Sequence, residues 1–231
     1  MSPIKILQLN NHGVLLLKQK KLEDAIKSFQ RARKYLSRPV AGRSTGRNAP
    51  SLPEGQLWSD ESLISGMDLC DTTRMRRDYS VSPHNTFDVY ECAFTFGDNF
   101  DPHTNDVVVS VVLQYNLALA YHLLALATIE GSTRHMHEAL RCYKQGVKII
   151  RYSTPFPGAE QLYLVTMAFL NNIGHIFSHF CQKKQSLNCR ERLDVLLGSG
   201  IPSFLSDDDL EFFDLGIFQT QGHFRMAAAA A

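Results

Sequence analysis

The chain lacks a large net charge of either sign. Its 24 Lys and Arg nearly balance 23 Asp and Glu. The balance is uneven along the sequence, because residues 1–39 hold nine basic residues against only Glu23 and Asp24. The acidic remainder disfavours nucleic-acid binding through the basic first part, since such binding needs a basic face that nearby acidic charge does not oppose.

Cysteine is also scarce, and its spacing argues against two common uses. The five cysteines are odd in number and form no Cys-x-x-Cys pair, which disfavours a disulfide framework and a zinc ribbon. The first 21 residues lack the basic-then-apolar order and the small-residue cleavage site of a secretory signal. We therefore expect a reducing compartment, either the cytoplasm or the nucleus.

The signatures of enzyme active sites are missing as well. Residues 41–47, AGRSTGR, contain glycines and a hydroxyl but not the Gly-Lys-Ser/Thr of a phosphate loop, and no serine stands in a nucleophile elbow. His175 and His179 lie four residues apart with Cys181 close by, but they lack the glutamate of a His-Glu-x-x-His zinc motif. A zinc or other metal site at this pair is disfavoured, and we expect neither an enzyme nor a bound cofactor.

What the chain does contain is a spacing of small and aromatic residues that suits two antiparallel helices. Gly13 and Ala25 would let the helices approach each other, and Phe29 would fill the gap between them. Ala32 would then leave room for the next hairpin. Apolar residues at helical spacing accompany this pattern and predict helices over residues 4–19 and 22–36.

The run Val107–Ala127 carries no formal charge and is long enough to be weighed as a membrane span. Three polar residues near its middle, Gln114, Asn116 and His122, and the lack of flanking Lys or Arg clusters argue against a span. We interpret the run as the first helix of a second hairpin, and we expect no membrane partner.

The small and aromatic spacing recurs in two further hairpins. The second helix of the second hairpin is expected over residues 135–151, where Ala139, Tyr143 and Gly146 repeat it. A third hairpin is expected from helices over residues 159–181 and 185–197. In its second helix Arg190 stands where Phe29 stood, so either the register slips or this helix caps the array with a polar face, and we expect the cap.

The insertion and the tail each contain one strand candidate. The first half of the insertion has no sustained periodicity, and we expect residues 40–60 to be flexible. Residues 85–96, NTFDVYECAFTF, alternate and are rich in aromatics, which predicts a strand near 88–96. The content of residues 212–218 predicts a second strand. Because a lone strand leaves its backbone unpaired, we expect these two to pair.

These blocks resemble tetratricopeptide (TPR) repeats. Their order, NNxGVLLLKQKKxEDAIKSF, LQYNLALAYHLLAL, LNNIGHIFSHF and a tail of the EFFxLxxF…AAAA type, is similar to that of the short TPR-containing proteins encoded in diatom genomes. The resemblance implies an all-α, TPR-like array of about three hairpins with an irregular insertion and a small two-stranded sheet, and it carries no function with it. The expected parts are a first hairpin (1–39), the insertion (40–106), a second, extended hairpin (107–151), a third, diverged hairpin (159–197) and an acidic, aromatic tail (198–231).

Asparagines recur at matching positions of the three first helices. The resemblance implies that these positions face the concave groove of the array, and the residues are Asn10, Asn11, Asn116, Asn171 and Asn172. An Asn amide both donates and accepts, so a row of them can hold the backbone of an extended peptide without reading its side chains. Alternatively, the amides bond to neighbouring helices.

We expect a scaffold that binds a protein or peptide in this groove. Two further groove positions, Lys18 and His175, complete the candidate site, and Lys18 would add charge for an acidic peptide end. A rival hypothesis keeps the fold and fills the groove from within. In it the acidic, aromatic tail, residues 207–218, folds across residues 18–38 of the basic first hairpin, which gives a self-capped or homo-oligomeric structural protein.

Overall fold

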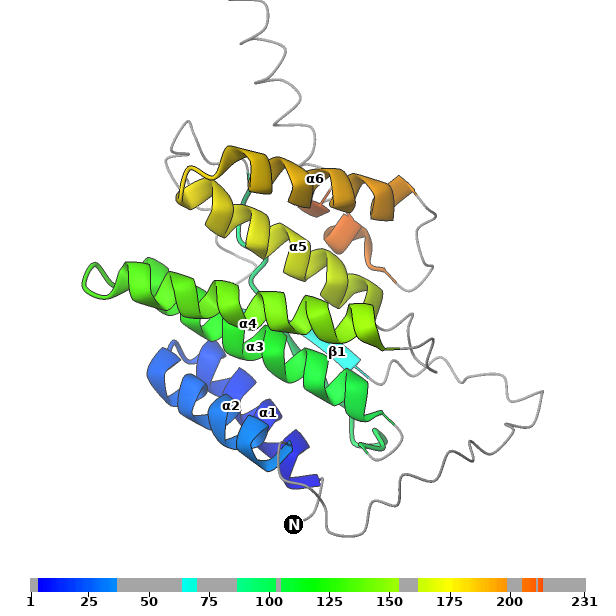
Figure 1. Cartoon of the computed structure of the whole chain (residues 1–231). Helices are drawn as coiled ribbons and strands as arrows, with labels where there is room; N and C mark the ends of the chain where they lie inside the picture. Colours follow the sequence, from blue (N-terminus) through cyan, green and yellow to red (C-terminus); the bar gives the residue numbers. More distant parts are fainter. Residues whose placement is uncertain are drawn as a thin grey trace, which may run out of the picture.

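The computed structural model describes residues 4–36, 64–69, 87–102, 105–153, 162–198, 205–210 and 212–213. Helices pack in sequential pairs, α1 with α2, α3 with α4 and α5 with α6 (Figure 1). This confirms the mostly helical class and the succession of three hairpins. The helices are α1 (Ile4–Lys18), α2 (Leu22–Leu36), α3 (Asp106–Ala127), α4 (Ser132–Tyr152), α5 (Leu162–His179) and α6 (Lys183–Gly198).

Glycines set the close approach of neighbouring helices. A Cβ added at Gly13 of α1 would lie 2.5 Å from Cε1 of Phe29 in α2, so only glycine admits the ring. Ala25 and Ala32 are fully buried on either side of that ring, as the spacing predicted. Gly146 of α4 plays the same part between hairpins, because its missing Cβ leaves room for the ring of Phe169 in α5.

The helix α3 lies at the centre of the array, packed against α2, α4 and α5 (Figure 1). Among the described residues it is the one helix long and apolar enough to cross a membrane, but 78% of its most apolar 18-residue window is buried within the protein. The polar residues at its middle, Gln114, Asn116 and His122, are buried as well. The uncharged run therefore supplies the core of the array.

The small sheet pairs two parts of the insertion. The strands β1 (Ile64–Asp68) and β2 (Cys92–Phe96) run antiparallel, with Ile64 opposite Phe96 and Asp68 opposite Cys92. The strand predicted near 88–96 thus contains β2. The prediction that β2 pairs with residues 212–218 is wrong, because β2 pairs with β1. The strand β1 lies in the part of the insertion where the sequence showed no sustained periodicity.

The described part of the tail explains that error. Phe212 and Phe213 are helical and bury aromatic rings, so their apolar content is used in packing and not in a strand. Residues 214–218 lie outside the described residues, as do residues 40–60, for which flexibility was expected.

The third hairpin keeps the register of the first but changes the source of its aromatic ring. Arg190, at the position of Phe29, is only 9% exposed and so does not contribute to an outer face. Other polar residues of α6 are exposed, as expected of a helix with a polar face: Lys184, Asn188, Glu191 and Arg192. The ring that fills the space beside Gly174 comes from Phe87 in the insertion. A Cβ at Gly174 would lie 2.6 Å from Cζ of Phe87. The insertion therefore completes the packing of the third hairpin.

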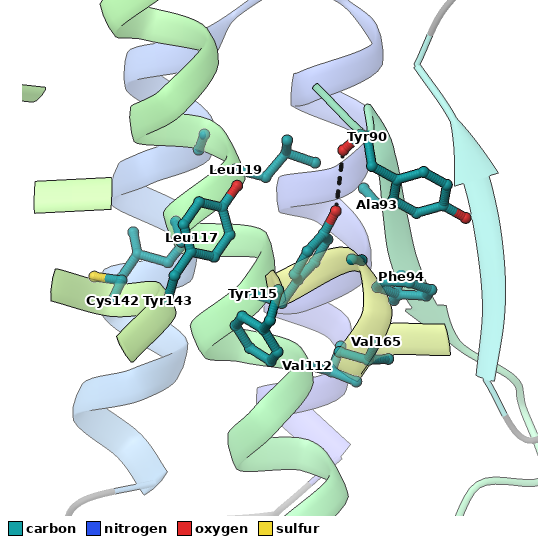
Figure 2. Packing of buried hydrophobic residues seen from close by; sticks show 14 of the residues in the cluster. Tyr90, Ala93, Phe94, Val112, Tyr115, Leu117, Leu119, Cys142, Tyr143 and Val165 are labelled. Atoms are coloured by element: carbon teal, nitrogen blue, oxygen red, sulfur yellow. Dashed lines mark hydrogen bonds between the residues drawn. The ribbon is translucent and has the colours of Figure 1, made fainter. Parts of the chain in front are cut away.

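The core joins the helices to the insertion without a break. Tyr115 of α3 packs its ring edge-on against Phe94 of β2 and Phe169 of α5, at centroid distances of 5.0 and 5.3 Å. Its hydroxyl donates to the carbonyl oxygen of Tyr90 at 3.1 Å, the contact dashed in Figure 2. Removing the insertion would consequently open the centre of the core.

Candidate functional site

The five asparagines lie on the helices α1, α3 and α5, and all of them bond to the backbone of one stretch of the insertion. We call residues 87–96 the internal segment. We call Asn10, Asn11, Asn116, Asn171 and Asn172 the asparagine ladder.

The first and second hairpins hold the C-terminal half of the internal segment. Asn11 Nδ2 donates to Phe96 O at 2.8 Å, and Asn11 Oδ1 accepts from Phe96 N at 3.0 Å. Asn116 binds Phe94 in the same two-point way, at 2.7 and 3.0 Å. Asn10 adds a third donor to this end, because its Nδ2 lies 3.0 Å from Phe94 O.

The third hairpin holds the N-terminal half with the same chemistry. Asn172 Oδ1 accepts from Tyr90 N at 2.8 Å while its Nδ2 donates to Tyr90 O at 3.1 Å. Asn171 Nδ2 donates to Asp88 O at 2.8 Å. The internal segment therefore crosses all three hairpins, with its N-terminal end on α5 and its C-terminal end on α1.

The ladder replaces a neighbouring β-strand along one edge of the segment. Successive residues of an antiparallel strand turn their backbone groups to opposite edges. Phe94 and Phe96 face the asparagines, so Ala93 and Thr95 face the other edge, where they stand opposite Met67 and Ser65 of β1. Each two-point amide reproduces the N–H and C=O pair that a strand would offer.

Side chains of the segment are anchored as firmly as its backbone. Phe94 is 1% exposed, and Tyr90, Phe96 and Phe87 are buried too. The ring of Phe96 packs on Phe100 at a centroid distance of 4.7 Å. The aromatic content that predicted a strand here therefore also fixes the segment in the core.

The tail contacts the segment at Tyr90. The Tyr90 hydroxyl donates to Asp209 Oδ1 at 2.5 Å, and its ring lies against Phe212 and Phe213 at centroid distances of 5.1 and 5.0 Å. The described tail lies beside α5 and α6, away from α1 and α2 (Figure 1). The hypothesis that the tail crosses the basic first hairpin is therefore not supported by the part that the structure describes.

The two remaining candidate residues occupy other positions of α1 and α5. Lys18 is exposed at the end of α1. The nearby Lys20 contacts the sheet instead, with Nζ 3.4 Å from Leu69 O. His175 is buried and places Nδ1 3.0 Å from Nε2 of His122 in α3, so it links the two helices α3 and α5.

The buried histidine pair is held neutral by its surroundings. Burial, and then the charge of His179, lower the pKa of His175 to about 4. Burial, with His175 and His179 beside it, lowers the pKa of His122 well below its usual value. In the part of the chain that the structure describes, no group of three or more His, Cys, Asp or Glu is placed to hold a metal ion.

Sequence reasoning missed the hydroxyl groups behind the ladder. Asn172 Nδ2 also lies 3.3 Å from the Tyr115 hydroxyl and 3.0 Å from the Tyr143 hydroxyl. Both rings are fully buried, and a buried tyrosine hydroxyl usually needs a polar partner. A tyrosine inside the uncharged run 107–127 was the signal that could have identified Tyr115.

Comparison with known proteins adds no relative. Scans against protein-family models, curated proteins and solved structures find no match to this chain. The resemblance to TPR repeats therefore stays a prediction from the sequence.

Proposed function

We propose that this chain is a TPR-like scaffold that binds an extended polypeptide through the asparagine ladder, and that the internal segment occupies the binding site in the conformation described here. The observation that carries the proposal is the ladder itself. Five amides from three hairpins all bond to the backbone of one segment.

The helix pairs support the TPR-like assignment. Gly13 against Phe29 gives the close hairpin that the repeat requires, and Ala139 and Tyr143 stand at the corresponding buried positions of the second hairpin. The ladder residues recur on the first helix of each pair. A repeat array that turns one equivalent position of every hairpin to the same side is suited to a linear ligand.

Backbone recognition supports a polypeptide as the ligand class. Asn11, Asn116 and Asn172 each bond to both the N–H and the C=O of one residue, and every residue except proline presents that pair. Asn10, Asn116 and Asn172 are fully buried with the internal segment in place, and emptying the site would replace their bonds to its backbone by bonds to water, at a net loss of about 0.5–1.5 kcal/mol per bond. We infer that the site exchanges one strand for another and does not stand empty.

A permanently self-capped structural array is the second candidate function. Phe87 favours it, because this residue completes the packing of the third hairpin at Gly174. In that case the internal segment is a fixed part of the fold and no outside ligand enters. The partner class, a protein or peptide, and the cytoplasmic or nuclear location stay predictions in either case.

A peptide-binding experiment distinguishes the peptide-binding scaffold from the permanently self-capped array. The variant Phe94→Ala/Phe96→Ala removes two buried anchors of the internal segment and leaves every ladder asparagine in place. A labelled synthetic peptide of residues 85–96 is then titrated against this opened variant and against Thr95→Ala, whose side chain is only half-buried. Fluorescence anisotropy reports binding, and circular dichroism reports whether each variant is folded.

We expect the peptide to bind the folded opened variant and not Thr95→Ala, where the internal segment still fills the site. Adding Asn116→Ala and Asn172→Ala to the opened variant should abolish binding. A folded opened variant that ignores the peptide would support the permanently capped array and would contradict the peptide-binding proposal.

A further inference from the structure

We propose that the tail builds a tyrosine-selective subsite, so that the ligand of the asparagine ladder is an extended segment with tyrosine at one position and phenylalanine four and six residues later. The inference rests on the proposed function, because it names the ligand class of that same site. The tyrosine subsite consists of Ser206, Asp209, Phe212 and Phe213.

The subsite surrounds one side chain of the internal segment on both its apolar and its polar parts. Phe212 and Phe213 stand edge-to-face with each other at a centroid distance of 5.2 Å and both lie against the Tyr90 ring. Such pairs favour an aromatic guest. Asp209 Oδ1 then accepts the hydroxyl at 2.5 Å, a short bond of the charge-assisted kind.

Asp209 is positioned for this contact before the tyrosine arrives. Its backbone N–H donates to Ser206 Oγ at 3.1 Å, and Ser206 Oγ donates in turn to Asp209 Oδ2 at 2.6 Å. This reciprocal pair caps the helical turn that begins at Asp207 and fixes the carboxylate. One carboxylate oxygen is thus held by Ser206 and the other is left for a hydroxyl donor.

The chemistry of the subsite selects tyrosine over phenylalanine. Phenylalanine would fill the same aromatic space but leave the Asp209 oxygen without its donor, and sites built to bond a hydroxyl reject the analogue that lacks it. Burial raises the pKa of Tyr90, and the neighbouring Asp209 carboxylate raises it further, so the hydroxyl stays protonated and donates. Asp209 is only half-buried, so water can partly replace the lost donor, and we expect a preference of about tenfold.

Spacing completes the ligand description. The ladder holds Tyr90, Phe94 and Phe96 through their backbones, and all three side chains are buried. Phe94 packs against Tyr115, and Phe96 packs against Phe100. The ligand class is therefore Tyr-x-x-x-Phe-x-Phe in an extended conformation, and the chain carries one example of it in its own insertion.

Two peptides and two proteins test the subsite. Peptides of residues 85–96 with Tyr90 or with Tyr90→Phe are titrated against the opened variant Phe94→Ala/Phe96→Ala and against the same variant carrying Asp209→Ala. We expect the Tyr peptide to bind the opened variant about tenfold more tightly than the Phe peptide, and Asp209→Ala to remove that difference. Equal binding of both peptides to the opened variant would overturn the tyrosine subsite while leaving the peptide-binding function in place. Failure of both peptides to bind would instead contradict the proposed function.

A second measurement in the full chain does not depend on the opened variant being folded. Urea unfolding of Tyr90→Phe, Asp209→Ala and the double variant gives a double-mutant cycle. If Asp209 recognises the hydroxyl, each single change lowers the equilibrium constant for folding, and the double variant lowers it by a factor at least about threefold smaller than the product of the two single factors. Fully additive effects would show that the two groups do not interact and would overturn the subsite.

Discussion

The Asn116 side chain bonds to both backbone groups of Phe94, with Nδ2 2.7 Å from the carbonyl oxygen and Oδ1 3.0 Å from the amide nitrogen. Its Nδ2 also donates to Asn10 Oδ1 at 2.9 Å, so the contact links α3 to α1 as well as to the insertion. One buried amide therefore couples two hairpins and the internal segment.

Replacing Asn116 tests the cost of that contact. We predict that Asn116→Ala lowers the free energy of unfolding by about 2–4 kcal/mol, because the buried Phe94 N–H loses its acceptor and Asn10 Oδ1 loses the donor that Asn116 supplies. Urea denaturation measures the loss. Asn105→Ala is the matched control, since its exposed Nδ2 contact with Asp101 O should contribute less than about 1 kcal/mol. Equal losses for both variants would contradict the prediction.

Two glycine substitutions test whether Phe87 of the internal segment packs against Gly174 of α5. Alanine favours a helix over glycine by about 1 kcal/mol, so Gly198→Ala, with open space around its Cβ, should leave stability unchanged or raise it. Gly174→Ala should lower the unfolding free energy by about 1–3 kcal/mol, because its Cβ would lie 2.6 Å from Phe87. Thermal unfolding of both variants measures the difference, and a stabilised Gly174→Ala would show that Phe87 does not pack there.

Much of this fold could be predicted from the sequence because its cause is local. Gly13, Ala25 and Phe29 predict a helix pair because they contact one another within a single hairpin. The asparagines on successive first helices predict that those helices share one face. The partner of β2 could not be predicted in this way. Nothing local in ISGMD, residues 64–68, specifies pairing with residues 92–96, because the register depends on a segment already fixed by distant asparagines.

The occupant of the ladder was missed for a related reason. The row of amides predicted an extended backbone as its ligand, and the strand candidate at 88–96 was identified separately. To recognise that this strand is the occupant of the ladder, one must know that Phe87 packs on Gly174 and that Tyr90 bonds to Asn172. Both contacts join residues more than 80 positions apart in the sequence. The tail misled for the opposite reason, because Phe212 and Phe213 have strand-like content but pack as part of a helical turn.

Acid should destabilise the protein through its buried histidines. His122 and His175 have lowered pKa values in the folded state, so on acidification the unfolded chain takes up protons first. The free energy of unfolding should therefore fall as pH drops from about 6.5 towards 4, by up to about 1.4 kcal/mol per pH unit for each histidine. Urea denaturation across this range measures the slope.

A histidine variant assigns that slope. His175→Gln should flatten the decline between pH 6.5 and 4, while His137→Gln, at an exposed position of α4, should leave it in place. A decline of the same steepness in His175→Gln would assign the acid sensitivity to other groups.

Thiol labelling tests the burial of the second and third hairpins. Burial raises the pKa of Cys142, and it raises the pKa of Cys189 to about 11, so both thiols are shielded and protonated at neutral pH. We predict that iodoacetamide modifies exposed Cys181 at least about 100-fold faster than either of them. Mass spectrometry of proteolytic peptides resolves the sites, and rapid labelling of Cys189 in native buffer would contradict the packing of α6 on α5.

Hydrogen exchange at individual amides tests most directly whether the asparagine ladder holds the internal segment. The amide of Tyr90 donates to Asn172, and the amide of Phe94 donates to Asn116. Replacing one of these asparagines should therefore speed exchange first at the amide that it binds. We predict strong protection of both amides in the unaltered chain, faster exchange mainly at Phe94 in Asn116→Ala, and faster exchange mainly at Tyr90 in Asn172→Ala. Amides of Tyr90 and Phe94 that exchange in the unaltered chain as fast as those of an exposed loop would contradict the ladder.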